Sequence, residues 1–151
     1  MRTGKFPFFL IFVFFSIAFF YQCGSGESNQ MSRKDKIKYK QYLVEGKRLY
    51  KQHCSNCHQE DGSGLARLYP PLKGSNYLEN NEKKVICSIK NGQAGEITVN
   101  GIVFNQPMPS NPRLTNLEIA EISTYIYSNW GGKKKLFTHV EIGEILGKCN
   151  R

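Results

Sequence analysis

The sequence predicts a small, mainly α-helical domain that carries one short β-hairpin. Residues 116–130 place apolar side chains at helical spacing, and residues 83–90 fit a shorter helix. Residues 97–104 place β-branched side chains on both sides of Asn100-Gly101, a dipeptide that favours a type I′ turn between two strands. With 151 residues, the chain is long enough for one domain with appendages and too short for two.

The helix over residues 116–130 has recognisable signals at both ends. Thr115 is a suitable N-cap, and Glu118 follows it three residues later in the capping-box pattern. Gly131 and Gly132 end the helix. Its apolar side chains are expected to belong to the core, not to a functional site: Ile119, Ile122, Tyr125 and Ile126.

The N-terminal segment has the features of a secretory signal. Arg2 and Lys5 give it a charged start, and residues 8–21 form an uncharged apolar run of 14 residues. This run is shorter than the roughly 17 to 25 residues that a membrane-spanning helix needs. We therefore assign residues 1–22 to a signal peptide, with an uncleaved membrane anchor as the alternative. In both cases the rest of the chain leaves the cytoplasm.

Residues 23–41 are expected to form a lipid-anchored, flexible linker. Residues 24–40 are polar, contain Gly and Ser, and then become lysine-rich, so they offer no apolar face for packing. Cys23 directly follows the apolar run, which predicts its lipidation and an anchor on the periplasmic face of a membrane. Gln22 departs from the small residue that bacterial lipoproteins prefer there, so ordinary signal cleavage and an intact anchor remain as alternatives.

The chain is basic, with a formal net charge of +9. Two of its bases lie in the leader, so the mature chain keeps about +7. A basic surface suits nucleic acid, anionic lipid or an acidic protein partner. Export argues against nucleic acid, and much of the charge lies in the predicted linker, where it favours solubility.

Residues 54–58 have the sequence Cys-Ser-Asn-Cys-His, and Cys-x-x-Cys-His is the attachment signature of a c-type haem. Two thiols one helical turn apart, those of Cys54 and Cys57, add to the two vinyl groups of the haem. His58 then faces the iron as its proximal ligand. Zinc binding would need a second ligand pair, and the other cysteines stand alone. A thioredoxin-type redox pair would need a βαβ setting, which this chain lacks, and chance occurrence of the motif also stays open.

A second axial ligand for the iron is sought among three methionines. Met1 begins the leader and Met31 lies in the predicted linker, which leaves Met108. Met108 follows the haem motif by 50 residues, and the prolines on both sides stiffen its loop. The alternatives are that Met108 fills a gap in the core and that His139 is the ligand.

Residues 42–132 resemble a class I cytochrome c. Gly46 and Tyr50 stand eight and four residues before the haem motif, as a small residue and an aromatic residue do in the first helix of that family. The resemblance implies helices wrapped around one covalent haem, with a short hairpin before the axial-methionine loop. It also implies that Gly46 lies where the first helix crosses the last one, against Ile122 or Tyr125.

The segment after the motif supports the same resemblance. Residues 70–74, Pro-Pro-Leu-Lys-Gly, resemble the Pro-x-Leu-x-Gly run of the family. There the proline carbonyl accepts the ring N–H of the proximal histidine. The resemblance therefore implies that Pro70 orients His58 and influences the iron through it.

The expected ligand set favours electron transfer over catalysis. If His58 and Met108 both bind the iron, no coordination position remains for a substrate, and His/Met ligation raises the reduction potential. We therefore predict a carrier of single electrons between respiratory complexes, and not an enzyme. Its donor would be a quinol-oxidising complex or a dehydrogenase, and its acceptor a terminal oxidase or reductase. The alternatives are a haem-bearing subunit of a larger dehydrogenase or oxidase and a haem gas sensor.

The tail, residues 133–151, is expected to dock on the domain. Residues 139–146 have the spacing of a short amphipathic helix, which is too short to persist alone. Of five cysteines, two are assigned to haem and one to lipid. The remaining Cys87 and Cys149 are expected to form a disulfide, because free thiols tend to oxidise in exported proteins. A buried free Cys87 with a frayed tail and an intermolecular bridge through Cys149 are the alternatives.

Overall fold

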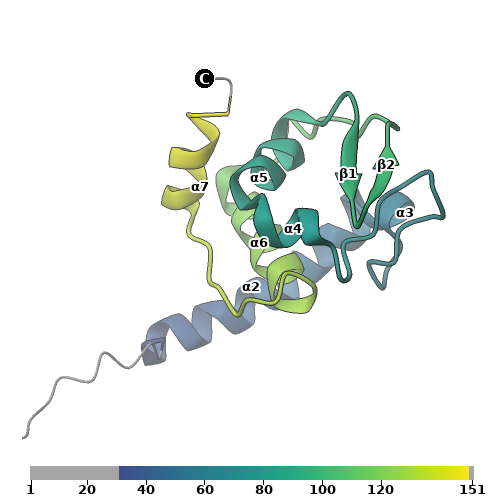
Figure 1. The fold of residues 1–151 in the computed structure, drawn as a ribbon. Helices are drawn as coiled ribbons and strands as arrows, with labels where there is room; N and C mark the ends of the chain where they lie inside the picture. The colour runs from purple at the N-terminus through teal and green to yellow at the C-terminus, as the bar shows by residue number, and fades with distance from the viewer. Residues whose placement is uncertain (1–30, 150–151) are drawn as a thin grey trace, which may run out of the picture. The chain divides into compact units, whose positions relative to one another are not determined.

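A computed structural model describes residues 31–149 of the chain (Figure 1). The predicted class, mainly α-helical with one hairpin, is confirmed. The predicted signal peptide and Cys23 lie outside the described residues. In chain order, the elements are α2 (Arg33–His53), α3 (Ser55–His58), α4 (Asn76–Asn80), α5 (Glu82–Asn91), β1 (Ile97–Val99), β2 (Ile102–Phe104), α6 (Asn116–Asn129) and α7 (His139–Leu146).

Helix α2 begins earlier than the sequence predicted. Residues 33–41, assigned above to a flexible linker, form its first turns, and the side chain of Ser32 caps it. The expectation that these residues have no packing face was wrong, because Tyr39 and Tyr42 lie three residues apart on one side of the helix. The Tyr39 hydroxyl lies 2.8 Å from Ser128 Oγ of α6 in a hydrogen bond, and Tyr42 is buried. No helix within residues 31–149 has both the length and the apolar content to cross a membrane.

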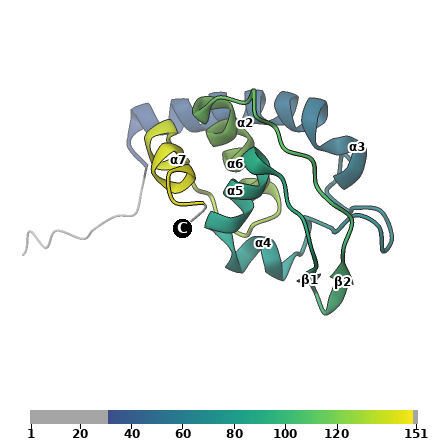
Figure 2. The ribbon, with the colours of Figure 1, turned by 90° about the horizontal axis from the view of Figure 1, so that it is seen from above.

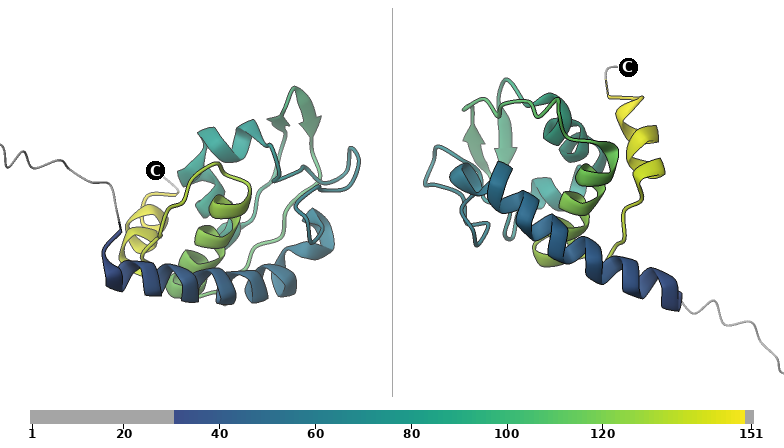
Figure 3. Two further views of the ribbon diagram at one scale, coloured as in Figure 1. Left: turned by 90° about the horizontal axis from the view of Figure 1, so that it is seen from below. Right: turned by 180° about the vertical axis from the view of Figure 1, so that it is seen from behind.

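Helices α2 and α6 cross in close contact, and this pair forms the most extensive interface between elements (Figure 3). A Cβ atom added to Gly46 would lie 2.8 Å from the Cβ atom of Tyr125 and would overlap the carbonyl group of Glu121. Only glycine lets the two backbones approach this closely. The predicted crossing of Gly46 against Tyr125 is therefore confirmed.

The buried residues of the main core cluster all belong to the segment from Tyr42 to Ile145. The described residues, 31–149, form one compact unit. Since this unit contains the whole of the described core, it has the apolar contacts it needs to fold without residues 1–30.

The predicted hairpin is present as an antiparallel β1–β2 pair, with Thr98 opposite Val103. Asn100 and Gly101 both have positive φ, 51° and 78°, as the type I′ turn requires. The Asn100 side chain accepts from the Asn76 backbone N–H at 3.0 Å, and the Asn76 side chain accepts from the Asn100 N–H at 2.8 Å. This exchange fixes the hairpin turn to the start of α4, a helix that the sequence did not indicate.

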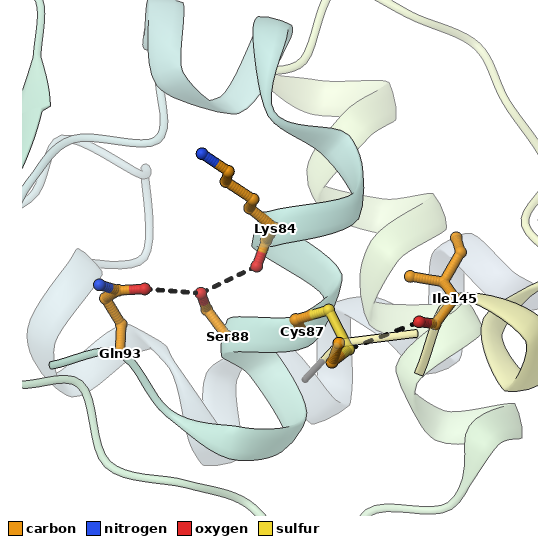
Figure 4. The surroundings of a disulfide bond; sticks show 6 residues. Lys84, Cys87, Ser88, Gln93 and Ile145 are labelled. Carbon is orange, nitrogen blue, oxygen red and sulfur yellow. Dashed lines mark hydrogen bonds between the residues drawn. A yellow bond between two sulfur atoms is a disulfide. The ribbon is translucent and has the colours of Figure 1, made fainter. Parts of the chain in front are cut away.

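The C-terminal tail docks on the domain through α7. A disulfide joins Cys87 of α5 to Cys149, as predicted, with 5.6 Å between the Cα atoms (Figure 4). Phe137 is fully buried, and its ring packs against Tyr127 at a tilt of 46°, with 5.2 Å between the ring centroids. The tail is therefore held by both a covalent bond and apolar packing, and neither a free Cys87 nor an intermolecular bridge describes this structure.

Candidate functional site

A cavity opens to solvent between α3, α4, α5, the hairpin and the loop that follows it (elements labelled in Figure 1). Of the described residues that line it, none is Lys, Arg, Asp or Glu. Five sequence-predicted site residues lie on its wall: Cys54, Cys57, His58, Pro70 and Met108. Their convergence from distant segments makes this cavity the candidate site.

The cysteine pair sits at the junction between α2 and α3. Cys54 ends α2, where its N–H donates to Tyr50 O at 2.8 Å, and its carbonyl accepts from His58 N at 3.0 Å. This single turn places Cys54, Cys57 and His58 on the same cavity. Neither cysteine of the motif is bridged, in contrast to the pair that forms the disulfide in the same described chain.

Burial determines the chemistry of the Cys54 thiol. Burial and, secondarily, the neighbouring Cys57 raise the pKa of Cys54 to about 12. The group is therefore a neutral thiol near pH 7, which is unsuited to serve as a thiolate ligand. A thioether carries no charge, so it is compatible with this apolar position.

His58 is oriented by the carbonyl of Pro70, as the resemblance implied. His58 Nδ1 lies 3.0 Å from Pro70 O. A carbonyl oxygen only accepts hydrogen bonds, so Nδ1 carries the proton and Nε2 keeps its lone pair. Burial lowers the pKa of His58, and the Pro70 hydrogen bond opposes this shift without cancelling it. The neutral ring is thus in the form that coordinates a metal ion.

The contact between His58 and Pro70 depends on a glycine that was not identified from the sequence. Gly64 N donates to His58 O at 3.0 Å, so the loop after α3 turns back on the motif. A Cβ atom at Gly64 would lie 2.8 Å from Pro70 O, and φ is +69°. The signal that identifies this turn is the run Gly62-Ser63-Gly64, which begins four residues after His58.

Met108 is held on the cavity wall by its backbone. Met108 and Gln93 exchange two hydrogen bonds, at 2.9 Å and 3.0 Å, in an antiparallel bridge. A Cβ atom at Gly92 would lie 2.6 Å from Met108 O and 3.0 Å from Ser110 N, and φ there is +79°. Only glycine allows the methionine loop to lie so close to the end of α5. Neither Gly92 nor Gln93 was identified from the sequence.

Lys90 fixes the far end of the same loop. Its Nζ donates to the carbonyls of Pro112 at 2.8 Å and Leu114 at 2.6 Å. The backbone N–H of Asn111 donates to Lys90 O at 3.0 Å. The segment that carries Met108 is therefore attached near the C-terminal end of α5 at two places, at the methionine itself and three to six residues after it.

The alternatives for the second ligand find no support in the geometry. Met108 is partly exposed and stands outside the buried core cluster, so it does not fill a gap in the core. His139 is exposed at the start of α7 and does not line the cavity. His53 is also exposed and off the cavity. Within residues 31–149, no group of three or more His, Cys, Asp or Glu side chains is placed to hold a metal ion, as a zinc site would require.

These residues fit a haem group. The wall offers an extensive apolar surface, two unbridged thiols, a neutral histidine with a free Nε2 lone pair, and a thioether from Met108. The apolar contacts come from several elements, among them Leu72, Leu78, Ile97, Phe104 and Ile126.

Comparisons with known proteins agree with this site. Residues 43–130 match the family model for cytochrome c. Cytochrome c-552 of Thermus thermophilus is 33% identical over 114 residues, which cover 70% of this chain and 86% of the relative. The cytochrome c subunit of a quinone alcohol dehydrogenase from Gluconacetobacter polyoxogenes is 30% identical over 92 residues, which cover 60% of this chain and 19% of that subunit. The chain therefore belongs to the cytochrome c family, as a class I electron-transfer protein with covalently bound haem c and its iron.

Proposed function

We propose that this protein is a monohaem carrier of single electrons between respiratory complexes outside the cytoplasm, and that it catalyses no reaction itself. The observation that carries the proposal is the joint presence of His58 and Met108 on one apolar cavity. A quinol-oxidising complex or a dehydrogenase would be the donor. A terminal oxidase or reductase would be the acceptor.

Each residue of the site has a proposed role. Cys54 and Cys57 would form the two thioether bonds to the haem, His58 and Met108 would ligate its iron, and Pro70 orients the histidine. The bound haem supplies one iron that alternates between two oxidation states. With both axial positions filled by the protein, no position is open to a substrate, which supports a carrier over a haem enzyme or gas sensor.

The surrounding structure supports rapid electron transfer. The apolar wall would replace water on the sides of the haem that it covers, so less solvent has to reorient when the charge changes. The two attachments of the methionine loop to α5, at Gln93 and Lys90, hold Met108 at a fixed place. Replacement of water by a rigid environment lowers the cost of reorganisation during the reaction.

A second candidate function has a specific observation in its favour. The similarity to the cytochrome c subunits of quinone alcohol dehydrogenases supports a haem-bearing subunit within a larger dehydrogenase. In that case the same site would transfer electrons inside a permanent complex.

We also propose that the protein is exported and tethered to the periplasmic face of a membrane by a lipid at Cys23. The apolar run at residues 8–21 and the cysteine after it support this. Since α2 begins at Arg33, nine residues separate it from Cys23. Even fully extended, they span at most about 32 Å.

Extraction of native membranes in mild detergent, followed by size-exclusion chromatography, tests the carrier proposal. A carrier separates from larger complexes, and its haem is reduced by quinol-treated membranes and reoxidised in air by the same membranes. Stable co-elution with one dehydrogenase would favour the subunit reading. Haem that stays oxidised with active, quinol-treated membranes would contradict both.

A further inference from the structure

The outer side of α2 carries exposed apolar side chains at its centre. Ile37 is 55% exposed and Val44 is 73% exposed, the highest value among the exposed large apolar side chains of the described residues. They are seven residues apart, which is close to two helical turns, so they lie on the same side. Single exposed aliphatic side chains are common, so these two are informative only together with the charges that flank them.

Basic side chains alternate with these two residues along the helix. Arg33, Lys40 and Lys47 also recur every seven residues, and each lies three or four positions from Ile37 or Val44. All three basic side chains are exposed, and none forms an ion pair within residues 31–149. We call these five residues the outer stripe of α2.

The acidic residues of α2 do not neutralise the outer stripe. Asp35 lies on the side of α2 opposite the stripe, where its carboxylate accepts a hydrogen bond from the hydroxyl of Ser32 at 2.7 Å. Glu45 forms an ion pair with Arg48 at 2.6 Å. The stripe therefore presents three uncompensated positive charges around an apolar centre.

No other described part of the chain covers the outer stripe. The buried side of α2, with Tyr42, Gly46 and Leu49, faces α6. Figure 2 shows α2 along one edge of the domain with the other helices on a single side of it, and Figure 3 shows the same from below. The stripe residues do not line the haem cavity, so a body bound to the stripe leaves the cavity wall uncovered.

We propose that the outer stripe of α2 binds the surface of an anionic lipid bilayer, with the helix lying along that surface. The apolar centre would enter the boundary between headgroups and acyl chains, and the basic side chains would contact phosphates. Chain connectivity supports a lipid surface over a soluble acidic partner. Cys23 and the apolar run before it precede α2 by only nine residues, at most about 32 Å of extended chain.

This orientation adds a property to the carrier proposal without depending on it. A domain held along α2 would keep its cavity at a constant distance from the membrane, where membrane-bound redox partners lie. The lipid-binding claim rests on the fold and the charges of α2 and, for the choice of a bilayer, on the proposed membrane tether at Cys23. It does not depend on which redox partners the protein serves.

Vesicle co-sedimentation of the haem-loaded protein beginning at Met31 tests the proposal, since this unit contains the complete described core. Vesicles of phosphatidylcholine with phosphatidylglycerol should bind it, and vesicles of phosphatidylcholine alone should bind much less. The variant Arg33→Glu/Lys40→Glu/Lys47→Glu should bind the anionic vesicles at least about 100-fold more weakly, since each basic residue near such a surface contributes about fivefold. The matched control is Lys83→Glu/Lys84→Glu/Lys148→Glu, which makes the same change in net charge at exposed positions elsewhere.

The apolar part has its own variants. Ile37→Ser/Val44→Ser should weaken binding to anionic vesicles, whereas Leu117→Ser/Val140→Ser, at exposed positions of α6 and α7, should not. The haem spectrum and far-ultraviolet circular dichroism verify that every variant is folded. Equal losses from the two charge variants, or equal binding to neutral and anionic vesicles, would overturn the proposal. The proposal would also be overturned if the stripe variants kept their binding to vesicles but lost association with an acidic redox protein.

Discussion

Removal of the disulfide between Cys87 and Cys149 should destabilise the domain without unfolding it. The bond closes a loop with a sequence separation of 62 residues. It is not the only attachment of the tail, because Phe137 and Ile142 are fully buried and Lys135 forms an ion pair with Glu82 of α5. We therefore expect α7 to remain docked in water after reduction.

The magnitude follows from the loop length. In the chain-entropy model, a cross-link over about 62 residues stabilises the folded state by about 4 kcal/mol at 25 °C. With a urea dependence of about 2 kcal/mol/M for a domain of this size, the unfolding midpoint should fall by about 2 M. Residual structure in the reduced, unfolded chain would make the shift smaller.

Urea titrations of the haem-loaded protein, with and without a phosphine reductant, measure this shift. The thioether bonds of the haem resist the reductant, so the change reports on the disulfide alone. The variant Cys87→Ser/Cys149→Ser should match the reduced protein and should not respond to the reductant. A midpoint that moves by less than about 0.3 M, or a Cys87 that alkylates freely without reductant, would refute the reasoning.

Two further perturbations test the methionine loop and the tail. Gly92→Ala should weaken the attachment of Met108 to the iron, because the new Cβ atom meets Met108 O and the backbone there, with φ 79° and ψ 179°, costs a non-glycine residue about 1 to 3 kcal/mol. The long-wavelength band of methionine-ligated ferric haem measures the loss, and an unchanged band would contradict it. Burial alone would raise the pKa of Glu82, but the hydrogen bond and charge of Lys135 outweigh burial and lower it. The ionised Glu82 therefore stabilises the folded state at pH values above the ordinary pKa of a glutamate. This stabilisation is lost as the pH falls through the lowered pKa of Glu82. Glu82→Gln should lower the free energy of unfolding by about 0.5 to 1 kcal/mol at pH 7 and remove that part of its dependence on acid pH. Urea titrations at pH 7 and pH 3 measure this. An unfolding free energy that falls equally in the wild type and the variant between the two pH values would contradict the prediction.

Local chemistry explains why much of the site could be predicted from the sequence. The Cys-x-x-Cys-His motif depends on one helical turn, and that turn is present at Cys54 to His58. Met108 was found by elimination, since the other two methionines lie near the N-terminus. The hairpin turn and the capping box at Thr115 depend on residues close in sequence, and both are confirmed.

What the sequence did not predict depends on contacts between distant segments. The first turns of α2 were missed because their partner at Ser128 lies 89 positions from Tyr39. Gly64 and Gly92 matter only because another backbone segment lies against each of them, and nothing in the local sequence identifies that segment. The double attachment of the Met108 loop to α5 is likewise a tertiary feature.

Carbon monoxide binding to the reduced protein tests the central claim that both axial positions belong to the protein. The reduced wild-type protein should bind carbon monoxide weakly, because Met108 occupies the position that the gas would take. Met108→Ala should bind it stoichiometrically, and Met31→Ala, the matched methionine control near the N-terminus, should behave like the wild type. Strong carbon monoxide binding by the wild-type protein, or a Met108→Ala variant that still excludes the gas, would contradict ligation by His58 and Met108.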